Sequence, residues 1–465
     1  MRSALLAIAL PFAGAAWLST PAAAQSEAEP TEPFRLHSAL GLPDWLTLEV
    51  EHRTRYESVD EDFRAGRVGS NQLFALRTLA YVAADIDRFR VAAELMDSRA
   101  YDGPADGFLN TTIVNAVELL QAHVGYRATD LVEQGDTFDI QAGRLTMNLG
   151  SRRLVARNRF RNTINGFTGL NSSYETADDA TLRAFYVLPV QRLPNDLTAL
   201  RDNEIEFDEE LDRTQFAGLY GSMPVNDGAF DAEAYALRLD EEDQGGAATR
   251  DRRLWTIGAR LHRDPAPDTT FFEWESAFQF GDSRTSSSST TDLDHEAQFH
   301  HLSVGYRFDG ESSLSVEALF DYASGDDDPN DGENNRFDTL FGARRFEFGP
   351  TGIFGAFARS NLVSPGLRMR FQPFQETRVM LATRLHYLAS DQDAFTTSGL
   401  SDPTGGSGRF LGQLAEIRIR HELVEGSVNL EFGLAHLFAG TFLEEAPGSD
   451  GEDSTYVYAT TVFKL

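Results

Sequence analysis

The chain of 465 residues contains no cysteine, and positive charge is scarce beside negative charge. Disulfide bonds are therefore excluded as a source of stability. With 41 Lys and Arg against 72 Asp and Glu, the formal net charge is −31, so no nucleic-acid partner is expected. Beyond the N-terminal segment, no stretch approaches the roughly 20 uninterrupted apolar residues of a membrane-spanning helix. Long helical patterns are also scarce, so stability must come from a large core or a closed sheet.

The N-terminal segment has the three parts of a secretory signal peptide. Met1-Arg2 provide a positive start, Ala4 to Leu18 are mainly apolar, and Ala22-Ala23-Ala24 form an A-x-A cleavage site. The apolar run is too short for a transmembrane helix and is followed by small residues. We therefore expect a signal peptide over residues 1–24, followed by a periplasmic N-terminal lead-in over residues 25–44.

From residue 45 to residue 465, segments of roughly ten residues alternate apolar and polar side chains, as in outer-membrane barrels. In the first segment, Leu46 and Leu48 share one face, and Glu51 and Arg53 share the other. A soluble antiparallel sandwich can also alternate in this way. About a dozen such segments in an exported chain without cysteine favour a barrel. The prediction is an all-β fold, a transmembrane antiparallel up-and-down β-barrel of about 18 strands in the bacterial outer membrane.

The lengths of the connections support the same fold. Short links such as Asp309 to Ser312 alternate with long ones such as Gln191 to Arg213 and Gly325 to Asn361. Outer-membrane barrels have short periplasmic turns and long extracellular loops. The outer wall would contact membrane lipid and lipopolysaccharide. Acidic runs fall in the predicted external loops, where a solvated surface is favoured over divalent-ion bridging to lipopolysaccharide.

Arginine recurs on the polar faces of the predicted strands, which would line the lumen. A guanidinium stays charged and binds a carboxylate through two parallel hydrogen bonds, so this lining suits a uronate or a phosphate. Carboxylates on the same faces, such as Glu94, Glu273 and Glu317, are the alternative partners, and this alternative is left open for any single arginine. The predicted pore-lining residues on strands are Arg53, Arg55, Arg77, Arg90, Arg260, Arg368, Arg370, Arg384, Arg418 and Arg420.

The segment from Gly143 to Asn162 concentrates positive charge, and no Asp or Glu occurs between Ile140 and Tyr174. A cation cluster in such an acidic chain needs a counter-anion, and an electropositive pore is favoured over internal neutralisation. Arginine rings at a constriction select anions. The segment is either a strand face or a loop folded into the lumen, and we expect it in the lumen. Its predicted pore-lining residues are Arg144, Arg152, Arg153, Arg157 and Arg159, and it also contains Arg161.

The sequence gives little support for a catalytic, metal-binding or cofactor-binding motif. The ten His residues, including His300-His301, show no metal-ligand spacing and no pairing with a nucleophile. The run from Asp326 to Asn330 resembles the start of a calcium loop, but Gly332 is one place late and no Glu occupies the twelfth position. We therefore expect no catalytic residues, no metal site, no cofactor and no enzymatic activity.

Several segments carry distributed motifs of one family. They are GR and LGSxRLV at Gly143-Arg144 and Leu149 to Val155, AFYVxPV at Ala184 to Val190, DYASGD at Asp321 to Asp326, RFDTLF at Arg336 to Phe341, and a closing strand with Tyr456-Val457-Tyr458. With these segments the chain resembles the alginate export family of outer-membrane barrels. The resemblance implies an 18-stranded barrel whose arginine-lined lumen passes a polyuronate from periplasm to exterior. Arg144 and Arg153 match the family motif.

Three functions follow as hypotheses. The first is an anion-selective channel that passes an acidic polysaccharide, alginate or a similar polyuronate, out of the periplasm, with a periplasmic export or synthesis complex as a partner. The second is a substrate-specific uptake porin for small anionic nutrients or oligosaccharides. The third is a barrel enzyme that acts on lipid or surface polymer, for which no residues stand out. Acidic external loops repel an incoming polyanion, which favours an exit route.

Overall fold

The computed structural model describes residues 34–67, 69–103, 109–243 and 248–465. The predicted signal peptide lies outside the described residues, as do residues 25–33 of the predicted lead-in. The described part of the lead-in contains a four-residue helix, α1 (Leu36–Ala39), just before the first strand. In the described part of the chain, no helix is long and apolar enough to cross a membrane.

Almost all regular structure is antiparallel sheet, in strands that cover most of the chain after residue 45. Two strands, β8 (Glu209–Glu210) and β15 (Glu333–Asn334), have only two residues. The others are β1 (Leu46–Asp60), β2 (Asn71–Ile86), β3 (Phe89–Tyr101), β4 (Asn115–Thr129), β5 (Thr137–Leu145), β6 (Phe167–Glu175), β7 (Thr181–Gln191), β9 (Thr214–Val225), β10 (Phe230–Glu241), β11 (Arg253–Arg263), β12 (Thr269–Ser283), β13 (Leu293–Arg307), β14 (Ser315–Ala323), β16 (Leu362–Phe374), β17 (Thr377–Tyr387), β18 (Phe410–Val424), β19 (Val428–Ala439) and β20 (Ser454–Lys464).

The strands close into a ring. Each long strand pairs antiparallel with the next along the chain, and the first strand pairs with the last from Glu51↔Lys464 to Asp60↔Thr455. Twenty strands form one sheet, and without β8 and β15 the closed barrel has 18. Closure leaves no sheet edge unpaired, which a sheet in lipid requires. The predicted barrel of about 18 strands is confirmed.

Side chains alternate between the two faces of the wall as predicted. Trp274 and Phe278 are 40% and 47% exposed on the outside, whereas Glu275 between them is 1% exposed. The same period places Leu367 outside and Arg368 inside. An apolar outer face is stable against hydrocarbon, while charged groups inside find partners or water. The period of two therefore separates a lipid-facing surface from a charged lumen.

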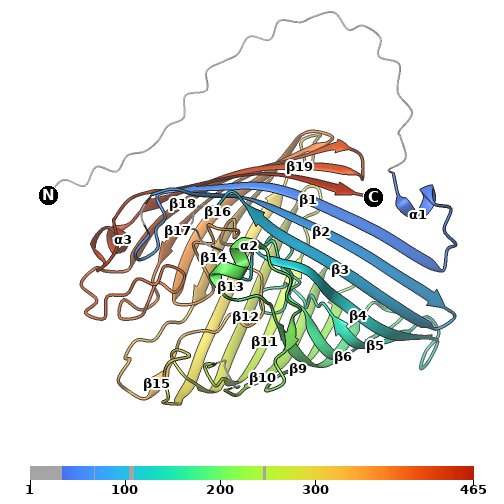
Figure 1. Ribbon diagram of the computed structural model, residues 1–465, viewed down its shortest axis with the longest axis horizontal. Helices are drawn as coiled ribbons and strands as arrows, with labels where there is room; N and C mark the ends of the chain where they lie inside the picture. The colour runs from blue at the N-terminus through green and yellow to red at the C-terminus, as the bar shows by residue number, and fades with distance from the viewer. Residues whose placement is uncertain (1–33, 68, 104–108, 244–247) are drawn as a thin grey trace, which may run out of the picture.

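Connection lengths define the two ends of the barrel. The β2–β3 connection is two residues (87–88) and the β16–β17 connection is also two (375–376), whereas the β14–β16 connection runs over residues 324–361. Both ends of the described chain lie at the short-turn end, away from α3 and β15 (Figure 1). Short turns mark the periplasmic end of such barrels. We call the other end, with the long loops, the extracellular end.

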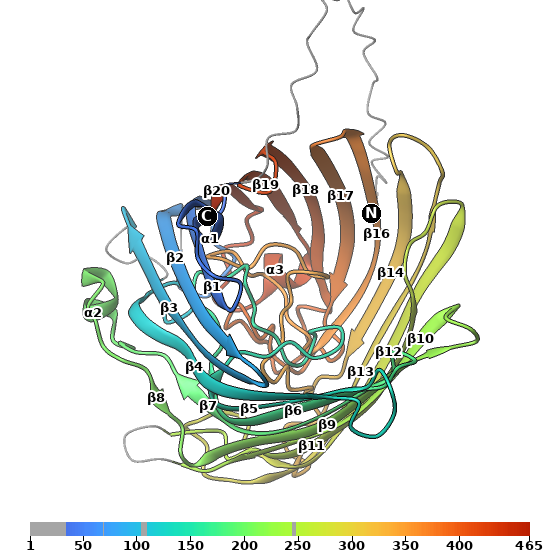
Figure 2. The same cartoon turned by 90° about the vertical axis from the view of Figure 1, so that its right-hand side faces the viewer.

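Long loops fill much of the extracellular half of the barrel. They contain two short helices, α2 (Leu197–Asp202) and α3 (Thr441–Glu445). Phe354 and Phe357 from the β14–β16 loop pack with Phe395, Phe442 and inner wall residues in one buried cluster. Looking into the ring of strands, Figure 2 shows loop segments inside it. The lumen is consequently narrowed by loops that contribute an apolar core of their own.

Large aromatic side chains lie across the sheet against glycines on the neighbouring strand. Tyr458 is the register partner of Gly433, and a Cβ added at Gly433 would lie 2.1 Å from the Tyr458 ring. The Tyr458 hydroxyl donates to Glu431 at 2.6 Å. Because glycine has no side chain, the Tyr458 ring can lie flat against the wall at this position.

We predict that Gly433→Val lowers the free energy of unfolding by about 1–3 kcal/mol, because the new side chain displaces the Tyr458 ring. Urea unfolding in detergent micelles measures the change. Gly221→Val is the matched control, since Gly221 also lies in a strand and an added Cβ meets only ordinary contacts there. Equal destabilisation of the two variants would contradict this account of Gly433.

Candidate functional site

The arginine-rich segment is a loop folded into the lumen. Strand β5 ends at Leu145 and β6 begins at Phe167, so most of the segment belongs to the β5–β6 loop (residues 146–166). This loop pairs with the β14–β16 loop through the bridge Val155↔Phe341 and through the hydrogen bond from Ala343 N to Arg152 O at 2.9 Å. The segment lies in the lumen, as expected, and most of it is a loop and not a strand face.

Arg153 joins these two loops to the barrel wall. Its guanidinium contacts Glu275 on β12 at 2.6 Å and Glu347 on the β14–β16 loop at 2.9 Å, and it also pairs with Glu273. Arg153 is 3% exposed. Burial lowers the pKa of its guanidinium, but the three carboxylates outweigh burial and hold that pKa well above its ordinary value. Arg153 therefore acts as a buried structural link.

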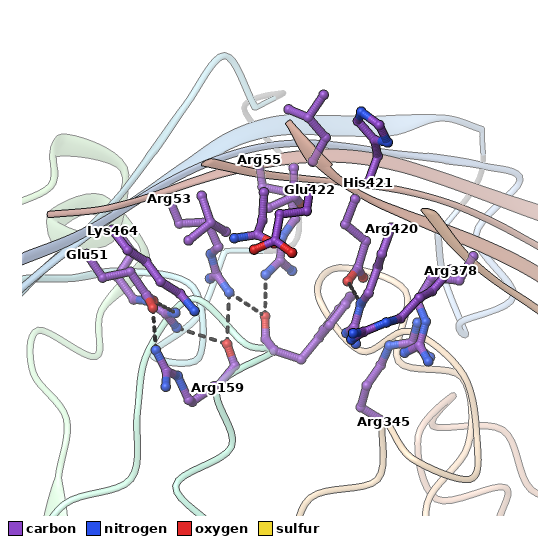
Figure 3. Close-up of a pocket in the computed structure, with 18 of the residues that line it drawn as sticks. Glu51, Arg53, Arg55, Arg159, Arg345, Arg378, Arg420, His421, Glu422 and Lys464 are labelled. Carbon is purple, nitrogen blue, oxygen red and sulfur yellow. Dashed lines mark hydrogen bonds and ion pairs between the residues drawn. The ribbon is translucent and has the colours of Figure 1, made fainter. Parts of the chain in front are cut away.

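Three wall arginines hold the β5–β6 loop by its backbone. Arg53 donates to the carbonyl oxygens of Arg159 at 2.8 Å and Arg161 at 2.9 Å, and Arg77 donates to the same two oxygens at 2.9 and 3.1 Å. Arg55 donates to the Phe160 carbonyl oxygen at 2.5 Å. Figure 3 shows Arg53 and Arg55 pointing from the wall toward the loop. These arginines, which we call the loop clamp, fix the loop in the lumen.

Several arginines of the β5–β6 loop form ion pairs, whereas the expected electropositive pore requires arginines without carboxylate partners. Arg157 binds Glu94 at 2.5 Å, and Arg159 pairs with Glu51. The expectation of an unneutralised run is therefore wrong for Arg157 and Arg159, as it is for Arg153, because the wall strands supply the carboxylates that the local sequence lacks. Arg161 instead points to the amide oxygen of Asn165.

Apart from Arg418, the other predicted arginines of the wall form ion pairs with neighbouring carboxylates. The pairs are Arg90 with Asp85, Arg144 with Glu118 and Glu210, Arg260 with Glu233 and Glu273, Arg368 and Arg370 with Glu317, Arg384 with Asp321, and Arg420 with Glu431. Internal neutralisation, left open from the sequence, accounts for these residues. The buried pairs among them, such as Arg384 with Asp321, fix geometry. Each pair, buried or exposed, leaves little net charge.

A cavity of about 600 Å³, which we call the main cavity, opens at the periplasmic end. It extends from Gln375 and Glu376 in the β16–β17 turn to Phe160 and Phe346 on the two inner loops. Ten Lys and Arg side chains and only four Glu line it, so it is positive inside a strongly acidic chain. Its basic residues are Arg53, Arg55, Arg77, Arg152, Arg159, Arg345, Arg378, Arg418, Arg420 and Lys464.

Five of these cations form no ion pair with any carboxylate of the described residues, and one of the five, Arg53, binds loop carbonyl oxygens instead. Arg152 lies over the Phe346 ring at 4.2 Å, and Arg378, Arg418 and Lys464 line the same space. Figure 3 shows Arg345, Arg378 and Arg420 converging on one side of the cavity. A positive lining without its own counter-anion attracts an anion from solution. The main cavity is therefore the candidate site.

Sequence reasoning missed two kinds of residue in the main cavity. Arg378 and Lys464 fall on the inward faces of β17 and β20, so their parity identifies them although they were not among the predicted pore residues. Arg345 lies on the β14–β16 loop, where no period applies, and it binds Glu416 at 2.7 Å. Only the folding of that loop into the lumen brings Arg345 to the site.

Two further cavities adjoin the main cavity. One, of about 260 Å³, shares Arg152, Arg345 and Arg418 with it and adds the neighbourhood of Arg153, Arg260, Arg368 and Arg370. The other, of about 610 Å³, shares Arg159 and Lys464 and adds Arg90 and Arg157. Arg144 and Arg384 line none of the three cavities. Across the described ranges, no group of three or more His, Asp or Glu is arranged to hold a metal ion.

We predict that Arg53→Met releases the β5–β6 loop, because it removes donors from the Arg159, Phe160 and Arg161 carbonyl oxygens. Hydrogen bonds from a charged donor contribute about 1.5–3 kcal/mol each. Single-channel recording should show a larger and noisier conductance than in the wild type. Arg90→Met is the control, since Arg90 pairs with Asp85 near the periplasmic turn. Wild-type conductance in Arg53→Met would contradict the clamp.

Comparison with known proteins places this geometry in a family. A family model described as alginate export matches residues 44–457, and a search of curated proteins found no match. Among solved structures, Acinetobacter baumannii OccAB2 is similar with a TM-score of 0.62 and 12% identity, covering 91% of this chain and 98% of that chain.

Two Pseudomonas aeruginosa structures are also similar. OpdO has a TM-score of 0.54 and 14% identity, covering 90% of this chain and 97% of that one. OccK2 (OpdF) in complex with glucuronate has a TM-score of 0.56 and 11% identity, covering 90% and 98%. At these identities the likeness shows the fold alone. Together with the match over nearly the whole chain, it establishes that the protein belongs to the alginate export family and forms an outer-membrane barrel channel.

Proposed function

We propose that the protein is an anion-selective channel that passes an acidic polysaccharide, alginate or a similar polyuronate, from periplasm to exterior. The observation that carries this proposal is the lining of the main cavity, with ten basic side chains and four glutamates in a chain of net charge −31. If the lumen had the same charge balance as the whole chain, it would be acidic. The excess of cations is local, and it lies at the periplasmic entrance.

The cations without carboxylate partners are the ones suited to contact a sugar acid. Arg152, Arg378 and Arg418 present guanidinium groups that can bind a carboxylate through two hydrogen bonds. Lys464 adds a point charge at the rim. The paired arginines, such as Arg153 and Arg157, keep the lining in place. A track of separate weak sites lets a polyanion enter and still leave, as conduction requires.

The outer surface favours exit over entry. Exposed carboxylates of the long loops include Glu204, Glu206, Asp327, Asp328 and Asp331. An acidic exterior repels a polyanion in solution, whereas the basic entrance attracts one from the periplasm. In this proposal membrane lipid and lipopolysaccharide surround the barrel wall. A periplasmic export or synthesis complex delivers the polymer at the short-turn end.

A second function, uptake of small anionic nutrients or oligosaccharides, is favoured by one specific observation. Phe354, Phe357 and Phe442 pack in the extracellular half, and the lumen is divided into separate cavities of about 600, 260 and 610 Å³. Such cavities suit a few sugar rings at a time. The similar OccK2 structure holds glucuronate, a single sugar acid. Both functions use the same basic lining.

We predict that Arg378→Gln/Arg418→Gln lowers the anion-to-cation permeability ratio by about tenfold, the change expected for about 1.4 kcal/mol of lost attraction. Reversal potentials in planar bilayers under a KCl gradient measure it. Arg99→Gln/Arg238→Gln is the charge-matched control, because these two arginines pair with Asp97 and Asp240 and line none of the three cavities. The control should keep the wild-type ratio.

A length series of polyuronate oligomers separates the two functions. Under the export proposal, purified channels in liposomes pass long oligomers, because the carboxylates step along the cation track. Under the uptake alternative, passage stops after one or two sugar rings. Efflux of fluorescently labelled oligomers from liposomes provides the measurement, with neutral oligomers of equal length as the control. Passage of neutral and acidic oligomers at equal rates would contradict both functions.

A further inference from the structure

A groove on the outer wall of the barrel lies at its extracellular end, outside the lumen. It has a volume of about 420 Å³ and is bounded by β12, β13 and β14 and by the first residues of the loops that follow β14 and β17. On β13 the outward Glu296 and Gln298 are exposed, whereas the inward His295 and Phe299 are buried. We call this cavity the outer groove, and its outward wall residues are Phe278, Phe280, Glu296, Gln298 and Tyr322.

The β14–β16 loop is tied to β13 beside the outer groove. The backbone N–H of Ser324 donates to the Gln298 carbonyl oxygen, and the Ser324 hydroxyl oxygen accepts from the Gln298 N–H, both at 2.9 Å. The Asn335 side-chain amide donates to the Glu296 carbonyl oxygen at 3.3 Å. Strand β15 of the same loop pairs with β13 at this end of the barrel (Figure 1). These bonds hold the rim of the groove in place.

Polarity changes in a fixed order along the outer face of β13. Leu302, toward the periplasmic end, is 50% exposed on the lipid-facing surface. His300 and Gln298 follow, and Glu296 lies nearer the extracellular end. Tyr322 on β14 stacks on His300 with ring centroids 6.0 Å apart. Aromatic side chains mark the border of the apolar band in such barrels, so the groove lies at the level of the lipid headgroups of the outer leaflet.

Hydrogen-bond donors lie at the border of the apolar band. The His300 ring nitrogens bond to the Gln298 amide oxygen at 3.1 Å and to the Ser276 hydroxyl at 2.8 Å. Since the amide oxygen of Gln298 is engaged, its amide nitrogen faces the groove without an acceptor among the described residues. The Tyr322 hydroxyl also has no hydrogen-bond partner among them. An amide N–H and a phenol O–H can both donate to a phosphate oxygen.

Carboxylates and aromatic rings form the rest of the lining. Glu296 and Asp327 are exposed, and neither forms an ion pair with a described residue. No Lys or Arg is among the described residues that line the groove. Phe278 and Phe280 are 47% and 44% exposed and present ring faces. Carboxylates and aromatic faces both attract an ammonium group.

We propose that the outer groove binds a zwitterionic phospholipid in the outer leaflet. Its ammonium group contacts Glu296 and Asp327, and its phosphate accepts hydrogen bonds from Gln298 and Tyr322. Its acyl chains lie against the apolar wall around Leu302. The order of these groups along β13 is their order along the lipid, and successive outward residues of a strand are about 7 Å apart. An anionic lipid without an ammonium group is repelled by the two carboxylates.

The test is native mass spectrometry of the protein in detergent micelles that contain equal amounts of phosphatidylethanolamine and phosphatidylglycerol with the same acyl chains. The wild type should retain more phosphatidylethanolamine. Glu296→Gln/Asp327→Asn should lower the ratio of the two retained lipids about fivefold, since it removes two partly exposed charge contacts. Asp282→Asn/Asp294→Asn is the charge-matched control, because both residues lie at the same ends of β12 and β13 and neither lines the groove.

Tyr322→Phe separates the phosphate contact from the ammonium contact. It should lower the retention of both lipids and leave their ratio unchanged, because both lipids have a phosphate. Heat-modifiable migration on gels verifies that each variant is folded, and Glu296→Gln alone serves if the double variant does not fold.

Equal retention of the two lipids by the wild type, or an unchanged ratio in Glu296→Gln/Asp327→Asn, would overturn the proposal. A third arm adds the phosphorylated diglucosamine lipid anchor of lipopolysaccharide to the mixture. Preferential retention of that glycolipid over phosphatidylethanolamine would also overturn it. None of these outcomes depends on what passes through the lumen.

Discussion

The interior of the barrel depends on one buried cation, the guanidinium of Arg153. It holds Glu273 and Glu275 of the wall and Glu347 of the β14–β16 loop at one point. Without this cation Glu275 would lose its arginine partner, whereas Glu273 and Glu347 would retain Arg260 and Arg359. Breaking a buried pair typically costs about 3–5 kcal/mol. The contact therefore fixes both inner loops relative to the wall, and all the cavities are bounded by these loops.

Once the loops are fixed, the arginines of the lumen divide into two groups. Arg53 and Arg77 bind backbone carbonyl oxygens, and most other wall arginines bind carboxylates. A smaller group, including Arg378 and Arg418, faces the main cavity without such partners. The paired group determines the shape of the lumen, and the second group determines its charge. A count of arginines in the sequence does not distinguish these roles.

The wall could be predicted from the sequence because its period of two is local. Alternation placed Arg368 inside and Leu367 outside, and connection lengths identified the two ends. The loops could not be predicted, because long-range contacts fold them into the lumen. Nothing near Arg157 or Arg159 in sequence reveals Glu94 or Glu51, which lie on strands β3 and β1. The partners of a loop cation depend on tertiary structure, which no local pattern records.

The central claim is that the lumen is positive although the chain carries a net charge of −31. The reversal potential of wild-type channels in a planar bilayer under a KCl gradient tests it most directly. A lumen lined by the cations of the main cavity predicts a reversal potential with the sign of chloride selectivity. A reversal potential with the sign of potassium selectivity, which the overall composition alone would give, would contradict the account.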